Sequence, residues 1–140
     1  MDKAFLNKIK SDFEFLGDFG FRNSKNKWDS INSKFSWVLE NIGIEIEIDL
    51  MDFSIFLLVV KVDDFKLPKG YYMYKGERVR AHLQLFLVKN KISFDKKQMK
   101  VIHSIYQRLR NNRSNQLLLE LSNAYSVLLK GVLEKLAKDS

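Results

Sequence analysis

The stretch that decides the fold runs from Glu40 to Asp64 and reads ENIGIEIEIDLMDFSIFLLVVKVDD. Within it, Ile42–Leu50 alternates strictly, with isoleucines or leucine at every even position and Glu45, Glu47 and Asp49 at odd ones. This period of two predicts a β-strand with one buried face and one solvent-facing face. The following run, Phe53–Val62, is almost wholly apolar, which predicts a central strand covered on both faces and joined through a turn at Met51–Asp52.

The residues before this pair predict a helix, a loop and a third strand. Near the start of the chain, apolar residues recur at helical spacing: Phe5, Ile9, Phe13 and Leu16. We expect this helix to end at Gly17 or Gly20. Residues Arg22–Ser33 are polar and predict a loop that holds Trp28, whereas Lys34–Glu40 alternates weakly and predicts a short strand.

The residues after the pair predict one ambiguous segment and two helices. Val79–Val88 fits both a strand and a helix, and we favour the strand. Asp95, with Gln98 three residues later, predicts the start of a helix over Lys96–Asn111, and a last helix spans about Asn115 to Lys138. We therefore expect a single α+β domain over residues 1–140: an antiparallel sheet of about four to five strands with an N-terminal helix and two C-terminal helices.

Composition narrows the class of protein. The chain has 140 residues, 46% of them hydrophobic and 29% charged, and it has no cysteine, which excludes disulfides and thiolate metal sites. Charged residues interrupt Met1–Gly17, and the apolar run Phe53–Val60 falls far short of the about 20 residues of a spanning helix. We expect a soluble cytoplasmic protein with no membrane partner and no cofactor.

Charge is unevenly distributed along the chain. Glu40–Asp64 carries seven acids and one base, whereas Lys75–Arg113 carries eleven bases and two acids, within a net charge of +7. Such polarity favours a macromolecular partner over a small substrate.

The acidic residues of the alternating strand are the first candidate site. Glu45, Glu47 and Asp49 lie about 7 Å apart on one predicted face. A solvated sheet face is the simplest interpretation, and a partner-binding face is the functional one. A metal or nuclease centre ranks last, because no catalytic lysine or histidine follows at a recognisable spacing, and we expect no metal.

The basic segment is the second candidate. Its possible binding residues are Arg78, Arg80, Lys96, Lys100 and Arg110. On the predicted helix, Lys96, Lys100 and Arg110 lie with His103 and Gln107 on a polar stripe opposite the apolar one. This stripe fits either an ordinary solvated helix face or a surface that binds nucleic-acid phosphates. Tyr71, Tyr72 and Tyr74 offer stacking surfaces, but no glycine–aromatic RNA-recognition pattern accompanies them.

No catalytic signature accompanies these charges. His82 and His103 are the only histidines, and structural roles are the expected ones. The tripeptide at Asp18–Gly20 matches the kinase magnesium motif, but the glycine-rich and catalytic loops of a kinase are missing. We therefore expect a protein that is not an enzyme.

The order of segments resembles one known group of proteins. A helix ends in FEFLGDFGF (Phe13–Phe21), and FSWVL (Phe35–Leu39), the alternating strand, the apolar strand and a helical C-terminal part follow. This layout over residues 5–88 looks like the small α+β immunity proteins of bacterial contact-dependent and other polymorphic toxin systems. The resemblance implies a protein that binds and neutralises a cognate toxin domain without catalytic residues. Immunity proteins against nucleases are often acidic, whereas this chain is basic, so either its acidic sheet face does the docking, or the toxin is itself acidic, or the resemblance is accidental. The alternative is a small basic nucleic-acid-binding module that uses residues 75–113.

Overall fold

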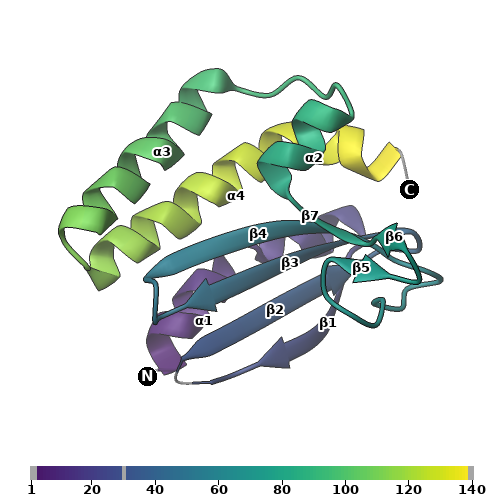
Figure 1. The fold of residues 1–140 in the computed structure, drawn as a ribbon, viewed down its shortest axis with the longest axis horizontal. Helices are drawn as coiled ribbons and strands as arrows, with labels where there is room; N and C mark the ends of the chain where they lie inside the picture. The colour runs from purple at the N-terminus through teal and green to yellow at the C-terminus, as the bar shows by residue number, and fades with distance from the viewer. Residues whose placement is uncertain (1–2, 30, 139–140) are drawn as a thin grey trace.

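The computed structural model describes residues 3–29 and 31–138 and contains a five-stranded antiparallel sheet. The strand order is β1-β2-β3-β4-β7, and a separate two-stranded hairpin, β5-β6, lies in front of one end of the sheet in Figure 1. The strands are β1 (Arg22–Lys27), β2 (Asn32–Val38), β3 (Ile42–Asp49), β4 (Ser54–Lys61), β5 (Met73–Tyr74), β6 (Glu77–Arg78) and β7 (Arg80–His82). The helices are α1 (Lys3–Ser11), the 3-10 helix η1 (Glu14–Phe19), α2 (Leu83–Lys89), α3 (Lys96–Asn111) and α4 (Asn115–Lys138). The predicted α+β fold is confirmed.

One face of the sheet carries the hydrophobic core. Antiparallel register places Phe35, Ile46 and Leu57 side by side, and Trp37, Ile44, Val59 and Ala81 form the adjacent row. The apolar sides of α1 and α4 cover these rows, and α1 lies behind the sheet in Figure 1. The alternation of β3 therefore predicts its buried face correctly, because isoleucines two residues apart project to the same side of a strand.

The other face is not open to water as predicted. The segment of residues 62–79, here called the flap, folds back over it and contains the β5-β6 hairpin. Val38 and Val60 of the sheet pack with Val62 of the flap in a second apolar cluster, against which Phe65 and Leu67 lie. The expectation of a wet face is wrong because alternation distinguishes two faces but does not say what covers the polar one.

Two segments differ from their sequence-based prediction. Arg22–Lys27, predicted as loop, forms the edge strand β1, in which all six residues are exposed and the register shifts between Asn23 and Asn26. Because both faces of β1 are polar, its sequence lacks the alternation that would predict a strand. Its basic side chains and irregular register hinder the pairing of this edge strand with another chain. Val79–Val88, for which we favour a strand, divides instead into the short strand β7 and the helix α2.

The helical predictions agree more closely. The N-terminal helical region ends at Gly20, which adopts the left-handed conformation with φ 92°. Asp95 caps α3, since its carboxylate accepts the backbone N–H groups of Lys97 and Gln98. The Gln98 side chain does not complete a capping box but donates to the carbonyl of Ala124 on α4. None of the helices within the described residues combines the length and apolar content that a membrane-spanning helix needs.

Candidate functional site

The predicted acidic docking face is internal. Glu45 is 1% exposed and Glu47 is 5% exposed, so the expectation that they point into solvent is wrong. Arg80 of β7 binds Glu45 through two contacts, Nε to Oε1 at 2.6 Å and Nη2 to Oε2 at 3.1 Å. The hydroxyl of Ser36 also donates to Glu45, at 3.3 Å. A buried carboxylate is tolerated because these charged and polar donors replace water.

The other two carboxylates also have intramolecular roles. The hydroxyl of Tyr71 on the flap donates to Glu47 at 2.6 Å, and the ammonium of Lys34 lies 3.7 Å from the second oxygen of Glu47. Burial, followed by this bond to Glu47, raises the pKa of Tyr71. Asp49 is half-buried and accepts the N–H groups of Met51 and Asp52, which fixes the β3–β4 turn. A partner-binding role for the three acids stays a prediction. It depended on their side chains being exposed to solvent, which the structure does not show.

The predicted basic surface is divided among three places. Arg80 is buried, and its Nη1 donates to the carbonyls of Gly70 and Tyr71, so it is not part of a surface. Arg78 is exposed on the hairpin. Lys96, Lys100 and Arg110 are exposed on α3, which Figure 1 shows at the opposite end of the molecule from the hairpin.

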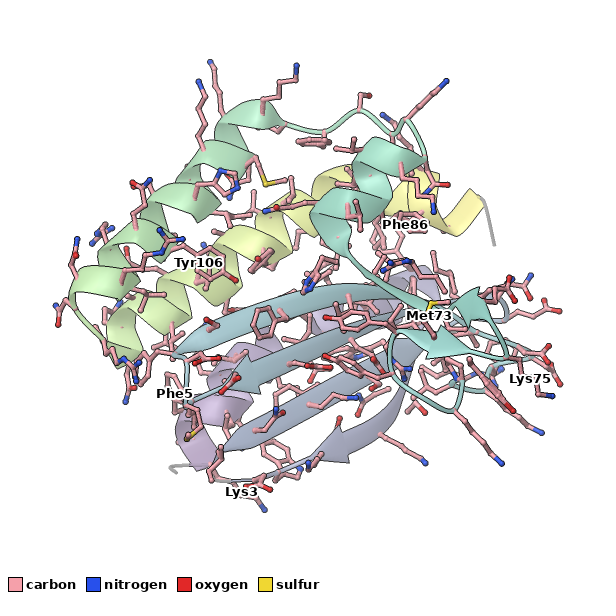
Figure 2. The ribbon with its side chains drawn as sticks, in the orientation of Figure 1. Lys3, Phe5, Met73, Lys75, Phe86 and Tyr106 are labelled. Atoms are coloured by element: carbon pink, nitrogen blue, oxygen red, sulfur yellow. The ribbon has the colours of Figure 1, made fainter. Side chains whose placement is uncertain are left out.

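A hollow of about 1160 Å³ lies among the sheet end, the flap and α2, and is here called the groove. Its apolar lining comes from β3, β4, the flap, β7 and α2 and includes Ile42, Val59, Val62, Leu67, Val79, Ala81, Leu85 and Phe86. Figure 2 shows Phe86 on α2 and, below it in the view, the hairpin that carries Met73 and Lys75. The groove is therefore an apolar opening built from segments far apart in sequence.

The helix α2 exposes apolar side chains at and beside the groove. Leu85, which lines the groove, is 48% exposed, and Val88, one turn further along the helix and outside the lining, is 65% exposed. The opposite side of α2 is buried through Leu83 and Leu87. A short helix that is apolar on both sides normally has both sides covered, so the outer side of α2 lacks a cover in the described structure.

Basic residues surround this apolar lining. Five of them have no ion-pair partner within residues 3–29 and 31–138: Lys66, Lys69, Lys75, Arg78 and Lys89. A sixth, Lys61, pairs with Glu77, and Asp63 is the other acid of the lining. The ammonium of Lys75 lies 5.3 Å from the centre of the Tyr74 ring. The groove therefore combines an aliphatic lining with an excess of positive charge.

Both histidines line a smaller hollow of about 240 Å³ beside β4. His82 Nε2 lies 3.1 Å from the hydroxyl of Tyr72, and His103 is exposed on α3. In the same place Tyr106 donates to the carbonyl of Ile55 and lies 3.0 Å from the hydroxyl of Tyr125. Within the part of the chain that the structure describes, no three His, Cys, Asp or Glu side chains form a metal-binding group.

Sequence reasoning missed the groove, although one local signal indicated it. The segment LQLFLVK of α2 is too apolar for a helix with one solvent-facing side. That signal can be interpreted only once the segment is known to be helical, because the same residues also fit a buried strand.

Comparison of the chain with protein-family models, with curated proteins and with solved structures finds no match. The assignment of the candidate site therefore depends on the geometry of the groove alone.

Proposed function

We propose that the chain is a non-enzymatic binding protein, most concretely an immunity protein that binds and neutralises a cognate bacterial toxin domain. The observation that carries this proposal is the groove with its aliphatic lining, beside the exposed Leu85 and Val88. Protein interfaces typically have an apolar centre inside a polar or charged rim, and the groove has both parts. As an immunity protein the chain acts in the cytoplasm and needs no cofactor.

The residues that carry the resemblance to immunity proteins support the layout rather than the contact surface. Phe13, Phe21, Phe35 and Trp37 are all buried in the main core, where the rings of Phe13 and Trp37 lie 6.2 Å apart. They hold the N-terminal helical region against the sheet. The surface that meets a toxin must lie elsewhere, and the groove is the apolar opening that the structure offers for it.

Neutralisation by this surface would work through occlusion. A partner seated on α2 and the groove would bury the aliphatic side chains that water now contacts, which favours association. The basic rim would speed the encounter and fix the register of the complex. No proton transfer or bond cleavage by this chain is required.

The test uses the toxin domain encoded beside this chain. Titration calorimetry should give a tight complex with the wild-type protein, and co-expression should restore growth of cells that make the toxin. Leu85→Ser with Val88→Ser should weaken both effects. Val101→Ser with Val127→Ser is the matched control, because these valines are comparably exposed on α3 and α4. Failure of the wild-type protein to bind any neighbouring gene product would contradict the proposal.

A second candidate, a small nucleic-acid-binding module, is favoured by one observation. Lys96, Lys100 and Arg110 are exposed along α3, together with His103 and Gln107. A row of cations on one helix can bind successive phosphates and release counterions. We place this candidate second because that row lacks the exposed apolar surface found at the groove.

A further inference from the structure

The groove gathers positive charge from the flap and from α2. Lys66 and Lys69 come from the first part of the flap, Lys75 and Arg78 from the hairpin, and Lys89 from the last turn of α2. Lysines and arginines brought together around one hollow repel each other, and this repulsion lowers the stability of the free protein. An anionic occupant would relieve it.

The flap that presents four of these cations is held in place by hydrogen bonds to the sheet and within itself. Arg80, itself fixed by Glu45, donates to the carbonyls of Gly70 and Tyr71. The backbone N–H of Val79 donates to the carbonyl of Tyr72, and Asp63 and Lys66 form an isolated β-bridge. The buried pair of Glu45 and Arg80 therefore positions the groove, and its cations do not depend on a loose loop.

The chemistry of the lining distinguishes between anionic occupants. Single-stranded nucleic acid binds best where aromatic rings stack on successive bases, whereas the apolar lining is mainly aliphatic and offers two aromatic rings, those of Tyr74 and Phe86. A small anion would need its donors at one point, whereas the cations surround a hollow of about 1160 Å³. Aliphatic contacts between positive charges fit a polypeptide that carries both carboxylates and apolar side chains.

We infer that the groove binds an acidic segment of a protein partner, with Asp and Glu side chains on the basic rim and an apolar side chain against the lining and α2. This inference rests on the proposed function in one respect only, the identity of that partner as a toxin domain. It gives the complex the opposite polarity from docking through the acids of β3, since this chain contributes the positive surface and its partner the negative one.

The test uses a fluorescently labelled peptide of Asp and Glu residues interrupted by Leu and Phe. Two comparison probes are the same peptide with Asn and Gln in place of the acids, and a labelled single-stranded oligonucleotide. The groove variant is Lys66→Glu, Lys69→Glu and Arg78→Glu. The matched control has the same change of charge on α3: Lys96→Glu, Lys100→Glu and Arg110→Glu. All six side chains are exposed, so neither variant should melt at a lower temperature than the wild-type protein.

We expect the acidic peptide to bind the wild-type protein and to lose about tenfold or more in affinity for the groove variant, which corresponds to about 1.4 kcal/mol or more of binding free energy. Two further variants separate the effect of charge from that of apolar contact. The control variant on α3 should bind the peptide as the wild type does. Leu85→Ser with Val88→Ser should weaken binding. The uncharged peptide should bind poorly. Equal losses in the groove and control variants would overturn the inference, because they would show a general effect of net charge. Tighter, groove-dependent binding of the oligonucleotide would overturn it as well.

The outcome is separable from that of the proposed function. A toxin domain that binds the wild-type protein and the groove variant equally would overturn this inference and leave the immunity proposal standing. Groove-dependent binding of the acidic peptide, with no binding to any neighbouring gene product, would support this inference and remove the toxin as the partner.

Discussion

Arg80 of β7 reaches across β4 to Glu45 of β3, with its Nε 2.6 Å from Oε1 and its Nη2 3.1 Å from Oε2 of the carboxylate. Its remaining nitrogen, Nη1, donates to the carbonyls of Gly70 and Tyr71 on the flap. One guanidinium group therefore joins the sheet to the flap. The flap covers this face of the sheet and carries most of the basic rim of the groove. Two charges are tolerated in this buried position because each satisfies the other.

Replacing Arg80 with leucine should strongly destabilise the protein. The change leaves Glu45 buried with only the more distant ammonium of Lys34, 3.9 Å from its Oε1, and breaking a buried pair typically costs about 3–5 kcal/mol of unfolding free energy. The double change Arg80→Leu with Glu45→Leu should recover much of this loss, since no unpaired charge remains. Urea denaturation measures all three proteins. Arg78→Leu, at an exposed position, is the control, and an Arg80→Leu variant as stable as this control would disprove the role assigned to the pair.

Reversal of the three acids of β3 should prevent folding. From the sequence alone, changing Glu45, Glu47 and Asp49 to lysine would leave the fold intact, but the structure places two of them inside beside Arg80 and Lys34. Buried like charges cost several kcal/mol, about half or more of the stability of a typical domain. Circular dichroism should show an unfolded chain.

The control for that reversal is a set of exposed acids changed to lysine: Glu40→Lys, Asp52→Lys and Asp63→Lys. These side chains lie at the surface, so the control should fold. A folded triple variant at Glu45, Glu47 and Asp49 would show that the flap does not cover this face in solution.

A charge on the opposite face of the same strand should also be costly. Ile46 is fully buried between Phe35 and Leu57, so Ile46→Asp places an unpaired charge in the core. We expect a loss of about 3–5 kcal/mol in unfolding free energy, measured by thermal and urea denaturation. Ile31→Asp, at an exposed isoleucine, should change stability little. Equal effects of the two changes would mean that the faces of β3 are reversed.

Stability should fall at alkaline pH. Burial raises the pKa of Tyr106 and Tyr125 in the folded protein above the usual tyrosine value of about 10. A pKa raised on folding means that the stabilisation is fully present below about pH 10 and is lost as the pH rises further. Ultraviolet absorbance of tyrosinate should show these two ionising together with unfolding. Changing both to phenylalanine should flatten the decline, and an unchanged decline would assign it to other groups.

Nucleic-acid binding by α3 should be weak and non-specific. Wild-type affinity for an oligonucleotide should fall steeply with salt, because phosphate contacts release counterions. Lys100→Glu with Arg110→Glu should remove what binding there is, as fluorescence anisotropy can measure. Tight binding to a defined oligonucleotide at physiological salt would place the second candidate function first.

The sequence by itself determined the parts of the protein that depend on local pattern. The alternation from Ile42 and the apolar run from Phe53 predict β3, β4 and their turn, and the structure pairs Ile48 with Ile55 across that turn. The cap at Asp95 likewise marks the start of α3. These features follow from side-chain spacing and from hydrogen bonds between near neighbours, so a window of a few residues contains the information.

Only the tertiary structure decided the fate of the charges and the place of the groove. Glu45 and Arg80 lie 35 residues apart, and nothing local in either segment shows that one will neutralise the other. The groove draws its lining from the sheet end, the flap and α2, and no one of these has a binding pattern of its own. Burial and ion pairing depend on which segments the fold brings together. Glu45 of β3, which the sequence predicts to be part of a docking face, therefore helps to hold the flap in place through Arg80. The flap in turn carries most of the basic rim of the open groove.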